Sequence, residues 1–294
     1  MNNWCIMWQS IEQAIKTETG EQFTIEKKRL ISTSESNLAY QLSNKQHHYF
    51  IKIKDKNHFN HFESEAYALN QIRSLKQITC PEVIALGSTL DKSFIVLDYI
   101  PFSHATEKHW YNLGAQLALM HKGSSHGQFG WQHDNYIGDT LQPNNWRSNW
   151  KTFFSEQRVA WQLQLLSEKS ITLGNIDHIT DICHDALNHH DVKPCLVHGD
   201  LWMGNLGFTD SLSVIYDPAC YYGDREVDIA MTELFGQLPY DFYQGYQDIF
   251  PLEKGYEQRK LIYNFYHILN HANLFGGIYI DQSRALLSRI LSLH

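Results

Sequence analysis

The chain has 294 residues, of which 43% are hydrophobic and 13% aromatic, enough apolar material for a large buried core. This length suits two lobes or domains better than one compact core. The chain carries 24 lysine and arginine residues against 32 aspartate and glutamate residues, which gives a formal net charge of −8. This balance argues against nonspecific binding to nucleic acid or an anionic membrane, which needs a basic footprint, but it allows a local basic pocket for a phosphorylated ligand.

The cysteines and the N-terminal segment indicate a compartment. The five cysteines are scattered and form no C-x-x-C pair, which argues against a disulfide framework or a zinc site. The segment MNNWCIMWQSIEQ lacks the basic start and continuous apolar run of a signal peptide. No stretch approaches the roughly 18 apolar residues of a transmembrane helix. We therefore expect a cytoplasmic protein with no membrane partner, a monomer in the simplest case, with an oligomer left open.

The first third of the chain mixes helical and strand patterns. Residues 4–18 place their apolar side chains on one helical stripe that ends at Gly20. Three short runs within 23–53 alternate apolar and polar residues and predict strands joined by polar turns. Residues 58–75 return to the helical period, and VIALG and SFIVLDYIP predict two further strands. This part is expected to form a small sheet with a helix.

Beyond Pro101 the pattern is mainly helical. Helices are predicted near 109–122, 146–168, 176–190, 226–235, 240–249, 257–275 and 281–293, with two short strands at 195–197 and 213–216. The fold class is therefore α+β. A small β-rich N-terminal lobe is expected over 1–97, a crossing segment or hinge at 98–100, and a larger, mainly helical lobe over 101–294.

The stretch LVHGDLWMGNLGF, residues 196–208, carries an acid and an amide among apolar residues and glycines. Asp200 and Asn205 have the D-x4-N spacing of a kinase catalytic loop, in which the aspartate faces the substrate hydroxyl and the asparagine holds Mg²⁺. Asp217 follows a β-like run and precedes Pro218, where a second metal-binding aspartate is expected. Carboxylate and amide oxygens suit Mg²⁺. Taken singly, each of these residues is equally typical of a turn or a cap.

A phosphoryl-transfer site of this class also needs a strand lysine on the ATP phosphates and a helix glutamate that holds it. Lys52 lies on a predicted strand, and Glu65 lies in or beside the apolar stripe of the next helix, where a carboxylate needs a partner. The alternative is a solvated lysine on an edge strand, the environment expected for Lys54. Asp98, Tyr99 and Ile100 fall where a hinge would present backbone groups to adenine.

With these residues in place, the sequence resembles the fructosamine kinase (ketosamine-3-kinase) family. That family belongs to the aminoglycoside-phosphotransferase-like branch of the protein-kinase fold. The resemblance is carried by HGDLWMGN, DPACYYGDREVDIAM and YHILNHANLFGGIY, with FESEA and FGWQHDNYIG, and it runs from the Lys52 strand to Tyr279. The HGD-x4-N core is common to many small-molecule kinases, whereas the tryptophan after it and the LFGG segment are more specific.

The resemblance implies a bilobal, protein-kinase-like fold and ATP-dependent phosphorylation of O3 of a ketosamine, a sugar–amine adduct formed by glycation. Loss of the phosphate would then release the amine. Asp200 would be the catalytic base and Asn205 and Asp217 the Mg²⁺ ligands, while Lys52 and Glu65 would serve ATP. Two further residues would contact the acceptor, Trp202 beside the sugar and Asp224 along the acceptor side.

Two features and two alternatives remain open at this stage. The loop expected to cover the phosphates reads STSESN at 32–37, without glycine and with Glu35 inside it, which raises a question about ATP affinity. For Trp202, a buried packing role in the core is the alternative to contact with the sugar. The alternatives are a kinase of the same fold for an aminoglycoside or a choline-like alcohol, and a silent ATP-binding module.

Overall fold

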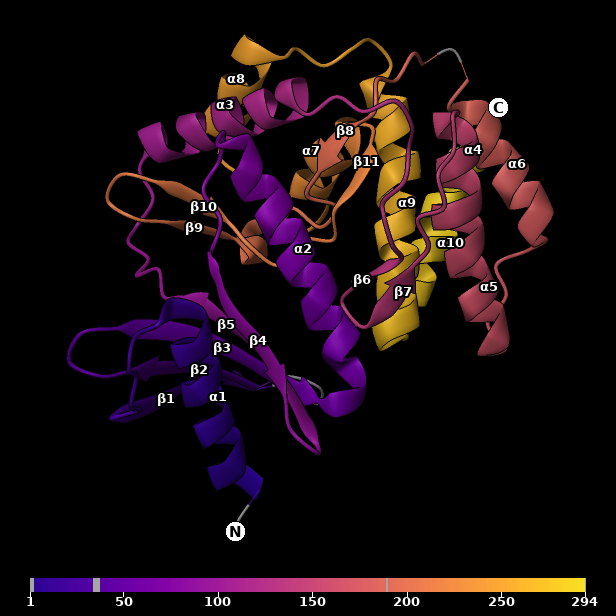
Figure 1. Cartoon of the computed structure of the whole chain (residues 1–294). Coiled ribbons are helices and arrows are strands. Elements are labelled where there is room, and N and C mark those ends of the chain that lie inside the picture. The colour runs from indigo at the N-terminus through magenta and orange to yellow at the C-terminus, as the bar shows by residue number, and fades with distance from the viewer. Residues whose placement is uncertain (1–2, 34–37, 189, 294) are drawn as a thin grey trace. The chain divides into compact units, whose positions relative to one another are not determined.

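The computed structural model describes residues 3–33, 38–188 and 190–293 (Figure 1). These residues form two compact units. The first comprises the chain up to His104 together with Gly207–Tyr216, and the second comprises Ala105–Leu206 and Asp217–His294. The predicted lobe boundaries at 97 and 101 stay predictions. Among the described residues, no helix combines the length and apolar character that crossing a bilayer requires.

The first unit is built on a five-stranded antiparallel sheet. Its strands are β1 (Lys27–Thr33), β2 (Leu38–Ser43), β3 (His48–Asp55), β4 (Val83–Ser88) and β5 (Lys92–Asp98), in the spatial order β1-β2-β3-β5-β4. Two helices accompany them, α1 (Asn3–Thr19) and α2 (Phe59–Leu75), the latter preceded by a 3-10 turn, η1 (Lys56–His58). The predicted helices and strands of this part are confirmed, with ends within a few residues.

The strand period decides which side chains reach which face of this sheet. Ile51 and Ile53 of β3 are buried in a core cluster with Met7, Ile11 and Ile15 of α1. Lys52, between the two isoleucines, projects from the opposite face. The sheet thus presents a lysine on the face that α1 does not cover.

The expectation of a solvated Lys54 is wrong. Strand β3 pairs with β2 on one side and β5 on the other, so it is not an edge strand. Lys54 is buried, and its Nζ atom lies 3.3 Å from Nδ1 of His61. Strand order, which local sequence pattern does not contain, decides this environment.

The second unit is mainly helical. Its longer helices are α3 (Glu107–Gly123), α6 (Ile176–Ala186), α7 (Glu226–Leu234), α8 (Tyr240–Ile249), α9 (Tyr256–Phe275) and α10 (Ile278–Leu291). The helix predicted over 146–168 begins only at Trp150 and has three parts: α4 (Trp150–Phe154), a π-helical turn, η2 (Ser155–Ala160), and α5 (Trp161–Glu168). The helix predicted to reach 190 ends at Ala186.

Two glycines allow the close packing of α3 against α8. A Cβ atom on Gly114 would lie 1.9 Å from the carbonyl oxygen of Phe242, and one on Gly245 would lie 2.0 Å from that of Tyr111. Both distances are far inside van der Waals contact, so any larger residue would force the helices apart. The two glycines therefore set the short distance between α3 and α8.

Three pairs of short strands lie in the described part of residues 135–223. Strand β8 (Cys195–Val197) pairs with β11 (Tyr221–Gly223), and β6 (Asn135–Ile137) pairs with β7 (Thr140–Gln142). A 3-10 turn, η3 (Met203–Asn205), leads into β9 (Leu206–Phe208), which pairs with β10 (Ser213–Ile215). The strands at 195–197 and 213–216 were predicted, whereas β6, β7, β9 and β11 were not.

Candidate active site

The loop between β8 and η3 carries Asp200, the predicted catalytic base. Gly199 has φ +82°, and a Cβ atom there would lie 2.2 Å from the carbonyl oxygen of Ala219. The backbone N–H of Ala219 also donates to the carbonyl oxygen of His198 at 2.8 Å. Only glycine therefore allows the chain just before Asp200 to lie against the segment that follows Asp217.

Asp200 and Asn205 are brought together as their spacing predicts. The amide nitrogen of Asn205 donates to the backbone oxygen of Asp200 at 2.8 Å and lies 3.3 Å from its carboxylate oxygen Oδ2. This orientation turns the amide oxygen away from Asp200, as a metal ligand requires.

Electrostatics at Asp200 fit a site for a cation. Burial, followed by the nearby Asp217 carboxylate, raises the pKa of Asp200 to about 7. A divalent ion beside Asp200 would offset the negative charge that Asp217 places near it. Asp217 itself has φ +56°, an uncommon conformation for a residue other than glycine. The donor set therefore fits Mg²⁺.

Asp228, on α7, holds the backbone of this loop. Its carboxylate accepts the N–H groups of His198 at 2.7 Å and Gly199 at 2.8 Å, and the ring of His121 lies 3.0 Å away. Burial raises the pKa of Asp228, but the hydrogen bonds and charges of His121 and His198 outweigh burial and hold it below its usual value. A buried, ionised side chain thus fixes the two residues before Asp200. Asp228 lies within the run DPACYYGDREVDIAM that carries the resemblance, but no role in the catalytic loop was predicted for it.

A second set of polar side chains, also missed by sequence reasoning, supports the chain after Asp217. Asn135 donates to the carbonyl oxygen of Cys220 at 2.7 Å, and Gln142 donates to that of Ala219 at 3.2 Å. Both amides belong to the β6–β7 hairpin, and Gln142 in turn accepts from Tyr266 at 2.6 Å. The hairpin therefore braces the backbone that follows the second predicted metal ligand.

In the first unit, Lys52 and Glu65 form the predicted pair. The Nζ atom of Lys52 lies 2.6 Å from Oε1 of Glu65, and their side chains are only 16% and 14% exposed. Because both groups are largely removed from water, the pair holds the ammonium in one orientation rather than as a mobile surface charge. The apolar stripe of α2 around Glu65 was the signal that found it.

The predicted hinge begins at the end of β5. The Asp98 carboxylate accepts the N–H of Glu82 at 2.6 Å, and the N–H of Asp98 donates to the carbonyl oxygen of Glu82 at 3.0 Å. Burial raises the pKa of Asp98. The N–H of Tyr99 is directed to the carbonyl oxygen of His48 at 3.3 Å. The Asp98 side chain thus binds β5 to the segment that leads into β4. Because this side chain is occupied, the predicted contact with adenine would have to come from main-chain groups, including those of Ile100.

The two predicted acceptor residues lie in different environments. Trp202 is 38% exposed, so it is not a core residue, and its ring covers Gly204. Asp224 is only 2% exposed, and its carboxylate accepts from Tyr263 at 2.5 Å and contacts His190 at 2.8 Å. The other oxygen of Asp224, Oδ1, accepts the N–H of Glu226 at 3.0 Å. Trp202 is thus accessible to an acceptor, whereas both oxygens of Asp224 are engaged inside the unit.

His190, Asp224 and Glu226 lie close enough together to suggest a metal site. However, Arg259 donates two hydrogen bonds to Glu226, both at 2.7 Å, and Tyr263 occupies Asp224. We therefore assign this cluster to a buried ion-pair network.

The loop expected to cover the phosphates is described only in part. Residues 34–37, including Glu35, lie outside the described residues, and Ser32 and Thr33 are exposed at the end of β1.

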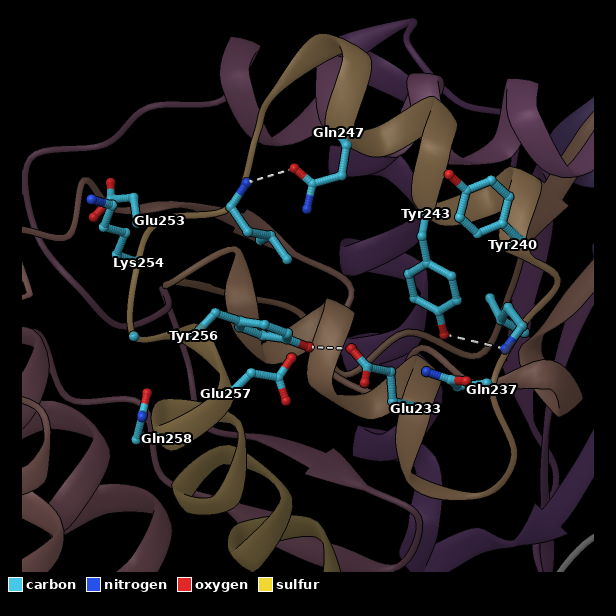
Figure 2. A pocket seen from close by; sticks show the side chains of 13 residues that line it. Glu233, Gln237, Tyr240, Tyr243, Gln247, Glu253, Lys254, Tyr256, Glu257 and Gln258 are labelled. Atoms are coloured by element: carbon cyan, nitrogen blue, oxygen red, sulfur yellow. Dashed lines mark hydrogen bonds between the residues drawn. The ribbon is translucent and has the colours of Figure 1, made fainter. Parts of the chain in front are cut away.

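A cavity of about 670 Å³ lies elsewhere in the second unit, between the end of α7, α8 and the start of α9 (Figure 2). Within it, the Tyr256 hydroxyl donates to Glu233 at 2.6 Å, and the N–H of Leu238 donates to the Tyr243 hydroxyl oxygen at 3.2 Å. None of the predicted site residues lines this cavity. This cavity is therefore separate from the predicted catalytic site.

The sequence matches a protein family and several curated proteins over nearly its whole length. A family model described as fructosamine kinase matches residues 7–293. A probable ketoamine kinase of Vibrio vulnificus is 45% identical over 287 residues, covering 97% of this chain and all of that protein. A probable ketoamine kinase of Escherichia coli is 39% identical over 286 residues, with coverage of 97% and 100%.

Solved structures also match this chain over nearly its whole length. A fructosamine-3-kinase candidate from Haemophilus somnus matches with a TM-score of 0.92 and 34% identity over 97% of both chains. An aminoglycoside phosphotransferase in complex with AMP-PNP and hygromycin B matches with a TM-score of 0.66 and 12% identity, covering 96% of this chain and 98% of that one. This second match concerns the fold alone, and it confirms the predicted kinase-like fold class.

Proposed function

Because the chain belongs to the fructosamine kinase family and is a phosphotransferase of kinase fold, we propose that it transfers the γ-phosphoryl group of ATP to O3 of a ketoamine. The observation that carries this proposal is the loop geometry: the Asn205 amide lies 2.8 Å from the backbone oxygen of Asp200 and 3.3 Å from its carboxylate. This pair provides a base for a hydroxyl acceptor beside a ligand for a metal–phosphate complex.

Asp200 would accept the proton of the acceptor hydroxyl as the oxygen bonds to phosphorus. Burial and Asp217 raise its pKa to about 7, near the operating pH that suits a general base. Asn205 and Asp217 would hold Mg²⁺, which when bound neutralises charge on the phosphates. Asp228 and the β6–β7 hairpin would keep the two loops from moving during transfer.

The nucleotide would be bound by the first unit. The Lys52 ammonium, fixed 2.6 Å from Glu65, supplies a positive charge for the α- and β-phosphates. The main chain at Asp98, Tyr99 and Ile100 would receive adenine. The solved aminoglycoside phosphotransferase with AMP-PNP is consistent with ATP as the donor on this fold.

The product explains a role in deglycation. A ketoamine carries its nitrogen on C1 and a carbonyl at C2, so loss of a C1 proton gives an enaminol. The enaminol electrons expel inorganic phosphate from C3, and water then hydrolyses the resulting imine to a dicarbonyl sugar and the free amine. The enzyme would need to supply only the phosphorylation, since phosphate is a far better leaving group than hydroxide.

The test measures ADP release with MgATP and a panel of acceptors: fructosamine and ribulosamine adducts of lysine, an aminoglycoside, choline and free sugars. The ketoamines are expected to exceed the other acceptors in kcat/KM by at least about tenfold, or about 1.4 kcal/mol in transition-state binding. The product should then release phosphate and lysine without further enzyme. Faster turnover of the aminoglycoside or choline would assign the alternative kinase activity, and no acceptor-dependent ADP release would favour a silent ATP-binding module.

A further inference from the structure

A chain of aromatic rings extends from the catalytic loop across the second unit. The ring of Trp202 lies 6.3 Å from that of Phe235, and Phe235 lies 4.6 Å from His271, measured between centroids. His271 lies 5.6 Å from Phe275 and 5.1 Å from Tyr279. We call these five residues the aromatic platform. Its first member stands two positions after Asp200.

The platform is open to solvent, although apolar rings are usually buried. Trp202 is 38% exposed, Phe235 37% and Phe275 67%. Three separate elements supply the rings: the catalytic loop, the end of α7, and the junction of α9 with α10. A contiguous exposed apolar patch of this kind marks a binding surface.

His271 adds one polar group to the platform. Its Nδ1 atom lies 2.9 Å from the carbonyl oxygen of His267, so Nδ1 donates and Nε2 remains an acceptor in the neutral ring. Burial lowers the pKa of His271, which favours that neutral form. The platform therefore offers aromatic faces, the Nε2 lone pair of His271 and the polar tips of Trp202 and Tyr279, without a positive charge of its own. Those groups suit a protonated secondary amine that bears a hydrocarbon chain.

We infer that the aromatic platform binds the amine side of the acceptor, with the ketoamine nitrogen and its hydrocarbon substituent against Phe235, His271 and Phe275. This inference rests on the proposed function and adds that the enzyme selects its substrate by the amine as well as by the sugar. The nitrogen is separated from O3 by only C1, C2 and C3, so a sugar at Asp200 must place its amine close to the catalytic loop. Trp202 links the two parts of the site.

The experiment compares two ketoamines that share fructose and differ only in the amine, N-benzyl and N-methyl. Phe275→Ala is expected to lower kcat/KM for the benzyl adduct about five- to tenfold and for the methyl adduct less than about twofold. Phe275→Tyr should retain the wild-type preference, and Phe235→Ala should reproduce the loss. Tyr240→Ala, at a 76% exposed tyrosine on the separate cavity, is the matched control and should change neither value.

The outcomes separate this inference from the proposed function. Wild-type enzyme that phosphorylates no ketoamine would overturn both. Phosphorylation of both adducts with equal losses in Phe275→Ala would overturn the platform alone. Light scattering under assay conditions tests another occupant: a wild-type dimer that Phe275→Ala dissociates would make the platform a subunit interface and refute the inference.

Discussion

The carboxylate of Asp228 accepts the backbone N–H of His198 at 2.7 Å, inside the unit and away from solvent. A second oxygen of the same group accepts the N–H of Gly199 at 2.8 Å. The position of Asp200 thus depends on an aspartate 28 residues further along the chain. Asp228→Asn would turn one acceptor into a donor facing an N–H group. We expect kcat to fall by about 10²-fold and the free energy of unfolding by about 3 kcal/mol.

The pH dependence of stability gives an independent check on Asp228. Its pKa is lower in the folded protein than its ordinary value, so its ionised form contributes stability above about pH 4, and that contribution is lost as pH falls through the folded pKa. The stability difference between wild type and Asp228→Asn should therefore be full at pH 7 and shrink below pH 4, as measured by urea denaturation. Asp281→Asn, at an exposed aspartate of α10, should show no such difference. A deficit that is the same at pH 3 and pH 7 would show that the charge has no part in it.

Asp200→Asn is expected to fold and to lose activity by about 10²- to 10⁴-fold, the usual range for a positioned general base. Binding of MgATP should be retained, because the amide keeps the shape of the side chain. Steady-state ADP release and calorimetric titration with MgATP measure the two properties separately. An unchanged kcat would remove Asp200 from the mechanism.

The same substitution should stabilise the metal-free protein at alkaline pH. Burial and Asp217 raise the folded pKa of Asp200 to about 7, so between pH 4 and 7 the folded state holds more protons than the unfolded state and loses stability as pH rises. Asparagine does not titrate. We expect the variant to gain about 1–3 kcal/mol over wild type on going from pH 4 to pH 8, measured without Mg²⁺. A variant less stable than wild type at pH 8 would show that burial and the Asp217 charge do not destabilise the ionised Asp200 carboxylate.

Asp217→Asn tests the ligand role rather than the base role. An amide binds Mg²⁺ more weakly than a carboxylate, so the variant should need about tenfold more Mg²⁺ for half-maximal rate. Its kcat should recover partly at high Mg²⁺, whereas that of Asp200→Asn should not. Titrating both variants with Mg²⁺ at saturating ATP gives the comparison. Equal insensitivity of the two to Mg²⁺ would count against Asp217 as a ligand.

Local pattern was sufficient for much of the fold and for the centre of the site. The stripes of α1, α2 and α9 and the alternation in β3 have many repeats, so their periods are clear. Asp200 and Asn205 are five positions apart, and one short turn brings them together. Lys52 and Glu65 lie 13 positions apart, on a strand and the following helix. In each case the information lies within a short span of the chain.

The failures concern relations over longer spans. The resemblance implied that Asp224 lines the acceptor side, but its carboxylate contacts His190 and Tyr263, which lie 34 and 39 positions away along the chain. Strands of three residues, such as β6 and β11, are too short to show a period. The hairpin that braces the Asp217 segment was therefore not recognised, although its first strand, β6, lies within the run FGWQHDNYIG that was quoted for its resemblance.

Lys52 and Glu65 are expected to act as one unit. Lys52→Ala should raise KM for ATP because the phosphates lose their cation, and Glu65→Ala should do so because the ammonium is no longer held 2.6 Å from a fixed carboxylate. The double variant should be little worse than Lys52→Ala, with a coupling of about 1–3 kcal/mol in a double-mutant cycle on kcat/KM for ATP.

Lys92→Ala and Asp55→Ala supply a control cycle, because that pair is 2.6 Å apart but 30% and 66% exposed. Surface pairs contribute little, so this cycle should give a coupling below about 1 kcal/mol in stability and none in kcat/KM. Defects of Lys52→Ala and Glu65→Ala that simply multiply would show that the contact between them has no part in binding ATP.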